Sequence, residues 1–405
     1  MLKGNCVVGQ SGGPTSVINA SLAGVIKAAS ESELIDSVYG AVHGIEGVLL
    51  GNLINLSERF DTDEKLDLLK HTPAAYLGSC RHKIAKDNDE EYEKVFKTFK
   101  ENNVKYFFYI GGNDSMDTVD RLSKYAKKID FPMIIVGIPK TIDNDLAITD
   151  HSPGFGSAAK YIATTMREII LDSQVYDKFT VTIVEVMGRN AGWLTCAAAL
   201  ARTEGNPAPH FIYLPEYTFS IEEFIKDIKE AGEKYKNVIV AVSEGVKTAD
   251  GKYVCESAML NAADSFGHKQ LTGTAATLAR FVAAETKAKV RAIELSLMQR
   301  CGAHIASLTD VTEAESIGIA GVKAALEGQN GVMVYYDRIS NNPYKIEIKT
   351  KPVSEVANVE RLVPKEWIDS KGQNVSPDLI NYILPLINGE SAPKFENGLP
   401  IYAKR

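Results

Sequence analysis

The stretch YFFYIGGNDSMD, residues 106–117, determines the fold class of this chain. It opens with five large apolar residues of the kind that strands favour, and two glycines follow at once. From Ser115 to Lys128 apolar residues return every three or four positions, which predicts a helix with one buried face. A strand that passes through a glycine turn into a helix is the unit from which parallel α/β sheets are built.

The same order of strand and helix recurs along most of the 405 residues. Short runs rich in Val, Ile, Phe and Tyr predict further strands at residues 5–8, 133–138, 180–186, 211–214, 238–242, 290–295 and 332–336. Amphipathic stretches predict helices at residues 16–30, 158–171, 194–202, 220–235, 274–286 and 317–327. The chain is therefore expected to be an α/β protein with mainly parallel sheets covered by helices on both faces.

A chain of this length is expected to form two or three domains. The polar segment 146–157 is a candidate crossing point between two lobes. We expect an N-terminal lobe over residues 1–150 and a second lobe over residues 151–335, with the chain crossing between them more than once. Residues 336–405 are then a C-terminal extension, with a strand at 345–349 and at least one helix.

The overall charge limits the kinds of binding partner that we expect. Lys and Arg number 45 and Asp and Glu number 52, which gives a net charge of −7. This balance disfavours nucleic acid and anionic membrane surfaces as partners, because both require a basic face. The five cysteines form no Cys-x-x-Cys pair, and neither a signal peptide nor an 18-residue apolar run is present, so we expect a cytoplasmic protein.

Four polar or glycine-bearing segments follow predicted strands, at the position where ligands bind in parallel sheets. They are residues 9–14 (GQSGGP), 111–117 (GGNDSMD), 137–145 (GIPKTIDND) and 185–192 (EVMGRNAG). Glycines let backbone N–H groups approach an anion, and a following helix directs its positive end at it. Each segment alone could be an ordinary turn, but the four together favour a phosphate site.

The charged residues of these segments suggest phosphoryl chemistry. A carboxylate such as Asp114 beside a phosphate loop calls for a cation, which makes Mg²⁺ plausible. Lys140 could balance phosphate charge, and an aspartate of the same segment could take a proton from an attacking hydroxyl. Arg189 is suited to bidentate phosphate binding.

Other nucleotide motifs fit less well. Residues 154–159 match Gly-x-Gly-x-x-Ala, but the preceding His-Ser-Pro is not a strand, so the context of a dinucleotide site is missing. A Walker A loop does not occur, and the seven histidines show no metal-ligand spacing.

With Ser-Glu-Gly at 243–245 and an Arg…Gln-Arg segment at 291–300, the order of these motifs resembles the 6-phosphofructokinase family over about residues 1–335. The resemblance implies two Rossmann-like lobes with the active site in the cleft between them. It implies that Asp143 is the general base toward the 1-hydroxyl of fructose 6-phosphate. Asp145 is then the second acid, near the metal, and Arg189 stabilises charge in the transition state.

The resemblance also divides the remaining residues between the two substrates. Contacts to the phosphoryl donor fall on Gly12, Arg81, Gly112, Asp114 and Lys140. Contacts to the sugar phosphate fall on Thr141, Ile142, Asp143, Met187, Gly188, Arg189, Glu244, Arg291 and Arg300. Asn113 stands where an Asp usually holds Mg²⁺, so it is the expected metal ligand, with Asp114 or Asp143 as further candidates.

Two residues indicate the donor. ATP-using members of the family have Gly-Gly-Asp-Gly-Ser and Pro-Gly-Thr-Ile-Asp-Asn-Asp, whereas this chain has Asp114 and Lys140 in place of the two variable glycines. An Asp at 114 would fill the space of a nucleotide α-phosphate and repel it. The pair is the mark of the diphosphate-dependent branch, with Mg²⁺ as cofactor, reversible phosphate transfer from diphosphate and a homodimer or homotetramer.

Two alternatives remain at this stage: an ATP-dependent enzyme, and a non-catalytic phosphosugar-binding subunit. Ala23 stands where allosteric bacterial members keep an effector-binding arginine, so regulation of that kind is not expected.

Overall fold

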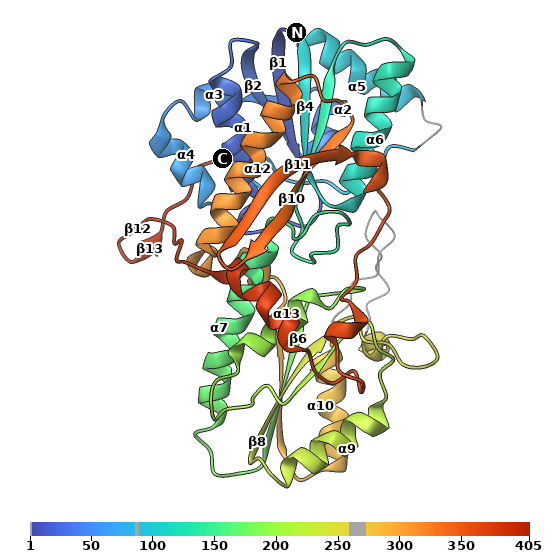
Figure 1. Ribbon diagram of the computed structural model, residues 1–405, viewed down its shortest axis with the longest axis vertical. Helices are drawn as coiled ribbons and strands as arrows, with labels where there is room; N and C mark the ends of the chain where they lie inside the picture. Colours follow the sequence, from blue (N-terminus) through green and yellow to red (C-terminus); the bar gives the residue numbers. More distant parts are fainter. Residues whose placement is uncertain (1, 86–88, 259–272) are drawn as a thin grey trace.

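The structure, a computed structural model, describes residues 2–85, 89–258 and 273–405. Two separate sheets of mostly parallel strands form two lobes, which lie one above the other in Figure 1. Helices cover the sheets, so the α/β class with mainly parallel sheets, expected from the strand–helix alternation, is confirmed.

The larger lobe contains seven strands in the order β11-β10-β5-β4-β1-β2-β3. Their bounds are β1 Gly4–Gln10, β2 Ile35–Ala41, β3 Leu53–Asn55, β4 Val104–Gly111, β5 Ile134–Pro139, β10 Val332–Asn341 and β11 Tyr344–Pro352. Neighbouring strands are parallel except for the β2–β3 and β10–β11 pairs. The carboxyl ends of β1, β4 and β5 therefore meet at one edge.

The smaller lobe contains four parallel strands in the order β7-β8-β6-β9. Their bounds are β6 Thr180–Val186, β7 Phe211–Tyr213, β8 Asn237–Ser243 and β9 Lys289–Glu294. A short hairpin of β12 Phe395–Glu396 and β13 Leu399–Pro400 lies apart from both sheets. Among the described residues, strand β9 pairs only with β6 and stands at the end of this sheet.

The α-helices have the following bounds. In the larger lobe they are α1 Ile18–Ser30, α2 Gly44–Leu49, α3 Leu56–Arg59, α4 Asp63–Lys70, α5 Asp89–Glu101, α6 Asn113–Lys128 and α12 Leu308–Leu326. The others are α7 Phe155–Ser173, α8 Trp193–Cys196, α9 Ile221–Gly232, α10 Thr274–Glu285, α11 Met298–Cys301 and α13 Pro377–Ile383.

The end of the chain is distributed differently from the simple order of lobe, lobe and extension. The expected boundary after residue 335 falls inside β10, which pairs with β5 of the larger sheet. α12 packs on α1, so residues 308–352 belong spatially to the larger lobe. The segment between β11 and α13 then crosses to the smaller lobe once more, on the right of Figure 1.

Two glycines allow α1 and α12 to lie almost in contact. A Cβ atom added at Gly24 would lie 2.1 Å from the carbonyl oxygen of Glu315, and one at Gly318 would lie 2.2 Å from that of Ser21. Both obstacles are backbone atoms, so neither can rotate away. This crossing attaches α12 to the sheet that carries the first glycine loop.

Gly24→Ala is therefore expected to destabilise the fold. Alanine normally favours a helix over glycine by about 1 kcal/mol, but overpacking against a backbone atom costs about 1–3 kcal/mol. We expect a lower melting temperature by calorimetry, whereas Ser30→Ala, at the exposed end of the same helix, should leave it nearly unchanged. An equal or higher melting temperature for Gly24→Ala would contradict the close crossing.

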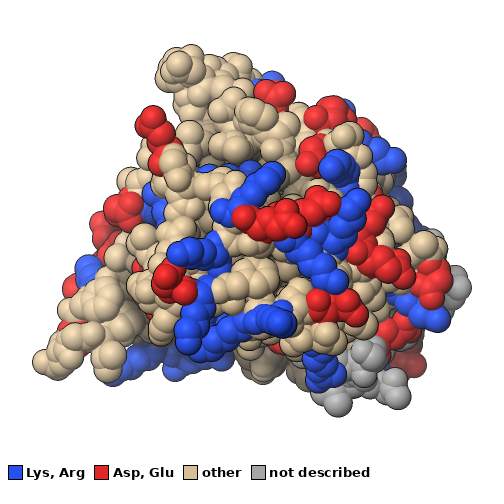
Figure 2. Space-filling model, turned by 90° about the horizontal axis from the view of Figure 1, so that it is seen from below, with Lys and Arg blue, Asp and Glu red and all other residues tan. Residues whose placement is uncertain are grey.

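The surface mixes both signs of charge. Figure 2, which views the end of the smaller lobe, shows lysines and arginines interleaved with acidic side chains. Ion pairs also occur between helices of the smaller lobe, as between Lys229 and Glu285 at 3.1 Å. This face therefore does not form the continuous positive surface that phosphate-backbone binding requires. In the described part of the chain, no helix is both long and apolar enough to span a membrane.

Candidate active site

A cavity of about 480 Å³ lies where the two lobes face each other. Its walls come from the loops that follow β1, β4 and β5 in the larger lobe and β6 and β8 in the smaller one. These are the carboxyl ends of parallel strands, where ligands of α/β proteins bind. The four motif segments therefore meet at one place, although they are spread over about half of the chain.

Most of the residues predicted for the site line this cavity. They are Gly12, Arg81, Gly112, Asn113, Asp114, Lys140, Thr141, Ile142, Asp143, Asp145, Met187, Arg189, Glu244 and Arg300. Gly188 and Arg291 were also predicted, and neither is among the lining residues.

Lys140 points at the first glycine loop. Its side chain is only 2% exposed, and its Nζ donates a hydrogen bond to the carbonyl oxygen of Gly13 at 2.7 Å. Gly12 has a φ of +75°, and a Cβ there would lie 3.1 Å from that Nζ, so the loop needs glycine for both reasons. Burial, together with the charges of Arg300 and Arg81, lowers the pKa of Lys140 to about 8, although Asp143 and Asp145 oppose this shift.

The segment after β5 holds two aspartates in a fixed conformation. Between them, Asn144 is fully buried, with a φ of +55°. Its side-chain oxygen accepts a hydrogen bond from the backbone N–H of Ser152 at 3.0 Å, and its Nδ2 donates to the hydroxyl of Tyr382 at 2.9 Å. These bonds anchor the backbone on which Asp143 and Asp145 stand.

The two carboxyl groups differ from ordinary surface aspartates. Burial raises the pKa of Asp143, and the charges of Lys140 and Arg189 counteract it. Burial also raises the pKa of Asp145, with the charges of Asp143 and Glu360, to about 7. A buried carboxylate whose pKa lies nearer neutrality is a stronger proton acceptor than a surface aspartate.

The smaller lobe contributes Met187, Arg189 and Glu244. The backbone N–H of Met187 donates to Oε1 of Gln299 at 3.2 Å, which holds the Met-Gly-Arg turn in place. The N–H of Gly188 donates to Oε1 of Glu244 at 3.4 Å. Gly188 thus acts on the cavity through Glu244, while burial and the charge of Asp143 raise the pKa of Glu244 to about 8.

Arg291 lies away from the cavity of the single chain. It is on β9, where its guanidinium stacks on the ring of Tyr176 at 5.5 Å. The other predicted sugar-phosphate arginine, Arg300, does face the cavity, and its Nη1 would lie 3.4 Å from a Cβ at Gly13. The structure therefore brings Arg300 close to the glycine loop but leaves Arg291 outside.

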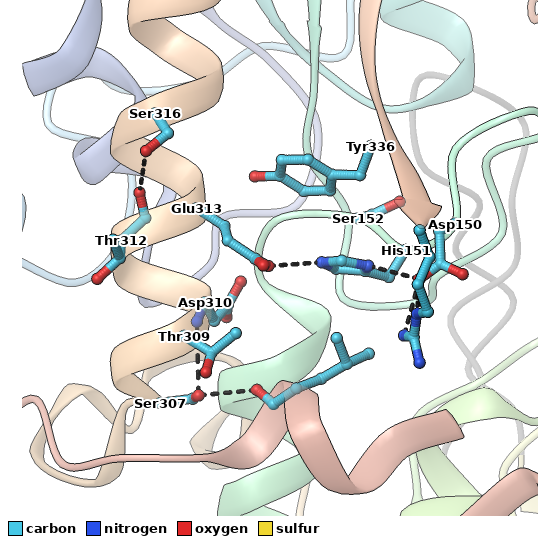
Figure 3. Close-up of polar contacts among 12 residues, drawn as sticks. Asp150, His151, Ser152, Ser307, Thr309, Asp310, Thr312, Glu313, Ser316 and Tyr336 are labelled. Carbon is cyan, nitrogen blue, oxygen red and sulfur yellow. Dashed lines mark hydrogen bonds and ion pairs between the residues drawn. The ribbon is translucent and has the colours of Figure 1, made fainter. Parts of the chain in front are cut away.

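We call residues 140–151, which follow β5, the aspartate segment. A buried ionic cluster holds the far end of this segment (Figure 3). Nδ1 of His151 is 2.8 Å from Asp150 and its Nε2 is 2.7 Å from Glu313 of α12, while its ring stacks on Tyr336 of β10. Burial alone would lower the pKa of His151, but the hydrogen bonds to Asp150 and Glu313 raise it overall. The segment that begins at Lys140 is thus tied at its end to two elements of the larger lobe.

Seven lining residues were not among the predicted site residues: Gly13, Pro14, Ser115, Asn190, Ala191, Asn358 and Glu360. The first five belong to the motif segments, whereas Asn358 and Glu360 lie outside them. Nδ2 of Asn190 donates to Oε1 of Glu360 at 2.9 Å, and the backbone of Glu360 forms an antiparallel bridge with Leu146. Asn358 and Glu360 come from the expected C-terminal extension, for which no role was predicted. Their only sequence signal is that polar residues follow the last long strand.

Asn113, the predicted metal ligand, is engaged elsewhere. Its Oδ1 accepts a hydrogen bond from the backbone N–H of Asn358, and its Nδ2 donates to the carbonyl oxygen of Val359 at 3.1 Å. The amide oxygen of Asn113 thus already accepts a hydrogen bond from Asn358, which would compete with a metal ion. Metal binding by Asn113 stays a prediction.

The family model described as phosphofructokinase matches residues 5–325. The chain belongs to the phosphofructokinase family. Among curated relatives, a pyrophosphate–fructose 6-phosphate 1-phosphotransferase of Halomonas elongata is 41% identical, over 100% of this chain and 96% of its own. A protein of the same name from Methylococcus capsulatus is 40% identical, over 98% of this chain and 95% of its own.

The fold is also similar to that of a solved structure of the family. The crystal structure of a pyrophosphate-dependent phosphofructokinase from Marinobacter aquaeolei is similar with a TM-score of 0.88. It is 38% identical, and the match covers 99% of this chain and 96% of that chain. The similarity therefore includes the C-terminal residues that lie beyond the family model, among them Asn358 and Glu360.

The protonation of Lys140, in the cavity, can be tested through the pH dependence of the rate. Lys140 carries its positive charge below its pKa of about 8 and loses it above. We therefore expect kcat/KM for a phosphate-bearing donor to fall as the pH rises through about 8, because this ratio reports the free enzyme. Lys140→Met should lack this alkaline limb; an unchanged limb in the variant would assign it to another group.

Proposed function

We propose that this chain catalyses the reversible, Mg²⁺-dependent transfer of a phosphoryl group from diphosphate to the 1-hydroxyl of fructose 6-phosphate. The products are fructose 1,6-bisphosphate and phosphate. The observation that carries the proposal is that Asp114 and Lys140 face the same cavity as the two aspartates of the following segment. The printed names of the relatives, matched over nearly their full length, support the same donor and acceptor.

The larger lobe is the proposed donor side. Its glycine loops supply backbone N–H groups to the phosphates, and Arg81 and Lys140 neutralise their charge. We call residues 111–114, which follow β4, the donor loop. Asp114, which pairs with Lys83 at 3.2 Å, places a carboxylate in this loop. That carboxylate leaves room for a short donor and repels the additional phosphate of a nucleotide.

The smaller lobe, together with the segment that follows β5 of the larger lobe, is the proposed acceptor side. Thr141, Ile142 and Met187 would line the sugar, Glu244 would accept a sugar hydroxyl, and Arg300 would bind the 6-phosphate. Gly188 supports this side through Glu244. Arg291 stays a predicted ligand of the sugar phosphate, which the single chain does not bring to the cavity.

The chemical step follows from these positions. Asp143 takes the proton of the 1-hydroxyl, whose oxygen forms a bond to one phosphorus of diphosphate. The bond from that phosphorus to the bridging oxygen breaks, and phosphate leaves with the electron pair. Lys140 and Arg189 stabilise the charge that develops on the transferring group.

Mg²⁺ is the proposed cofactor. When bound, it would neutralise charge on the diphosphate oxygens. The donor set fits this ion, because Asp145 and Glu360 offer carboxylate oxygens at the cavity. Mg²⁺ commonly uses one or two carboxylates together with substrate phosphates. Among residues 2–85, 89–258 and 273–405, no group of three or more His, Cys, Asp or Glu side chains is arranged to hold a metal ion.

We further propose a cytoplasmic homodimer or homotetramer. Exposed apolar side chains lie on α7, α11 and the residues beside them; they include Leu171, Val175, Tyr176, Leu297 and Met298. Tyr176 also contacts Lys289 and Arg291 of β9. A second copy would cover such a surface. Size-exclusion chromatography with light scattering is expected to give a mass of at least twice 44.2 kDa.

The reverse reaction tests the proposed donor. Fructose 1,6-bisphosphate, phosphate and Mg²⁺ are expected to yield fructose 6-phosphate, measured by a coupled dehydrogenase assay. Replacing phosphate by ADP should abolish the signal. Product formation with ADP and none with phosphate would overturn the diphosphate assignment in favour of ATP.

A further inference from the structure

The crossing from the larger to the smaller lobe that follows β11 passes next to the glycine loop after β4. We call residues 356–361 the cleft strap. It leaves the larger lobe after β11 and its following turn, and runs down to the smaller lobe (Figure 1). Two of its residues, Asn358 and Glu360, line the cavity. The strap therefore belongs to the site, although it lies outside the matched family model.

At its first end, the strap is held by the donor loop. Both amide atoms of Asn113 bond to the strap backbone, to the N–H of Asn358 and to the carbonyl oxygen of Val359 at 3.1 Å. Nδ2 of Asn358 also donates to Oδ1 of Asp117 on α6 at 3.3 Å. The donor loop and the strap are thus joined next to Gly112 and Asp114, which face the cavity.

At its second end, the strap is held by the aspartate segment. The N–H of Arg361 donates to the carbonyl oxygen of Asp145 at 2.7 Å, and its Nη1 donates to that of Thr149 at 2.6 Å. The guanidinium also lies 4.4 Å from the ring of Trp193, whose indole N–H donates to the carbonyl oxygen of Arg361. One short stretch therefore connects the donor loop to the segment that carries Asp143.

We propose that Asn113 is a positioning residue of the donor site: it fixes the cleft strap, and the strap holds the donor loop against the aspartate segment. This inference rests on the proposed function. An aspartate at 113 would keep the acceptor oxygen but lose the donor to Val359, and it would place a carboxylate against that carbonyl oxygen. The contacts to the strap thus give a physical reason for an amide at position 113.

Asn113→Ala and Asn113→Asp test the proposal. Loss of one or two backbone-anchoring hydrogen bonds is expected to raise KM for diphosphate about tenfold in each variant. KM for fructose 6-phosphate should stay within about twofold, because the sugar side of the cavity makes no bond to Asn113. Calorimetric titration with diphosphate and Mg²⁺, without the sugar phosphate, should show the same loss in affinity.

A second variant keeps the test valid if the first ones fold poorly. Asn358 has a φ of +63°, so Asn358→Gly suits the backbone and removes only the bond to Asp117. We expect a smaller rise in KM for diphosphate, about threefold. Asn397→Gly is the matched control, since Asn397 is exposed in the β12–β13 hairpin with a φ of +51°.

The outcomes separate the two proposals. If wild-type protein binds diphosphate and all strap variants bind it equally well, the positioning role is wrong and the proposed function stands. If Asn113→Asp leaves KM for diphosphate unchanged and lowers the Mg²⁺ concentration for half-maximal rate, residue 113 acts on the metal instead. If wild-type protein neither binds nor turns over diphosphate, the proposed function fails, and this inference fails with it.

Discussion

Asp143→Asn is expected to lower kcat at least ~100-fold, the lower range for loss of a general base. Asparagine has the size and shape of aspartate but cannot accept the proton of the attacking hydroxyl. KM for both substrates should change only a few fold, because the surrounding cations and glycine loops remain. The measurement is a steady-state titration of each substrate with the purified variant.

A control separates chemistry from folding. Asp337 is an exposed aspartate of β10 that pairs with Lys349 at 2.6 Å, far from the cavity lining. Asp337→Asn should keep at least half of the wild-type kcat. Because its surroundings raise the pKa of Asp143, the charged carboxylate is less stable in the folded than in the unfolded protein, so a neutral amide should not lower the melting temperature. A kcat for Asp143→Asn within threefold of wild type would remove Asp143 as the base.

Asp114→Gly with Lys140→Gly is expected to change the donor preference. Two unit charges 4 Å apart at an effective dielectric of 20 interact by about 4 kcal/mol. Losing the Lys140 charge should therefore reduce kcat/KM for diphosphate by at least ~100-fold, since each 1.4 kcal/mol is tenfold. Removing the Asp114 carboxylate should at the same time allow the rate with ATP to rise above that of wild type.

The single variants assign the two effects. Asp114→Gly alone should raise ATP use, because it removes the bulk and the negative charge of the donor loop. Lys140→Gly alone should weaken diphosphate use, because its Nζ is buried and points at the first glycine loop. If none of the three variants gains activity with ATP, the steric and charge argument for Asp114 is wrong.

Residues that the sequence placed after buried strands lie together at the cavity, because strand order determines where those strand ends meet. Gly12, Gly112 and Lys140 each follow a buried strand, and parallel neighbours bring these strand ends together. Met187 follows β6 in the same way, and predictions of this kind need only local patterns and one topological rule. Glu244, after β8, was predicted from the resemblance to the family instead.

Contacts between segments that are far apart in the chain could not be predicted from the sequence. Asn113 meets Asn358 across 245 positions, and no local pattern indicates that pairing. Strand β10 joins β5 through Val332 and Val136, so residues first assigned to a second lobe and an extension complete the larger sheet. The position of Arg291 likewise depends on the place of β9 in the smaller sheet, where it pairs with β6.

Some elements were missed for local reasons. α5 is dominated by charge, and its buried residues Tyr92, Val95, Phe96 and Phe99 are spaced as a helix but were not read as one. Asp36, Ser37 and Gly40 interrupt the apolar residues of β2, so it lacks the apolar run used to recognise strands. α12 begins nine residues before its predicted start, because Ser307 caps it by accepting a bond from the N–H of Asp310.

The most direct test of the central claim is the ratio of initial rates with diphosphate and with ATP, at the same Mg²⁺ and fructose 6-phosphate concentrations. The Asp114 and Lys140 pair predicts a ratio of at least ~100 in favour of diphosphate, from an interaction of several kcal/mol. A ratio of one or less would contradict the account, because those two side chains would then not select the donor.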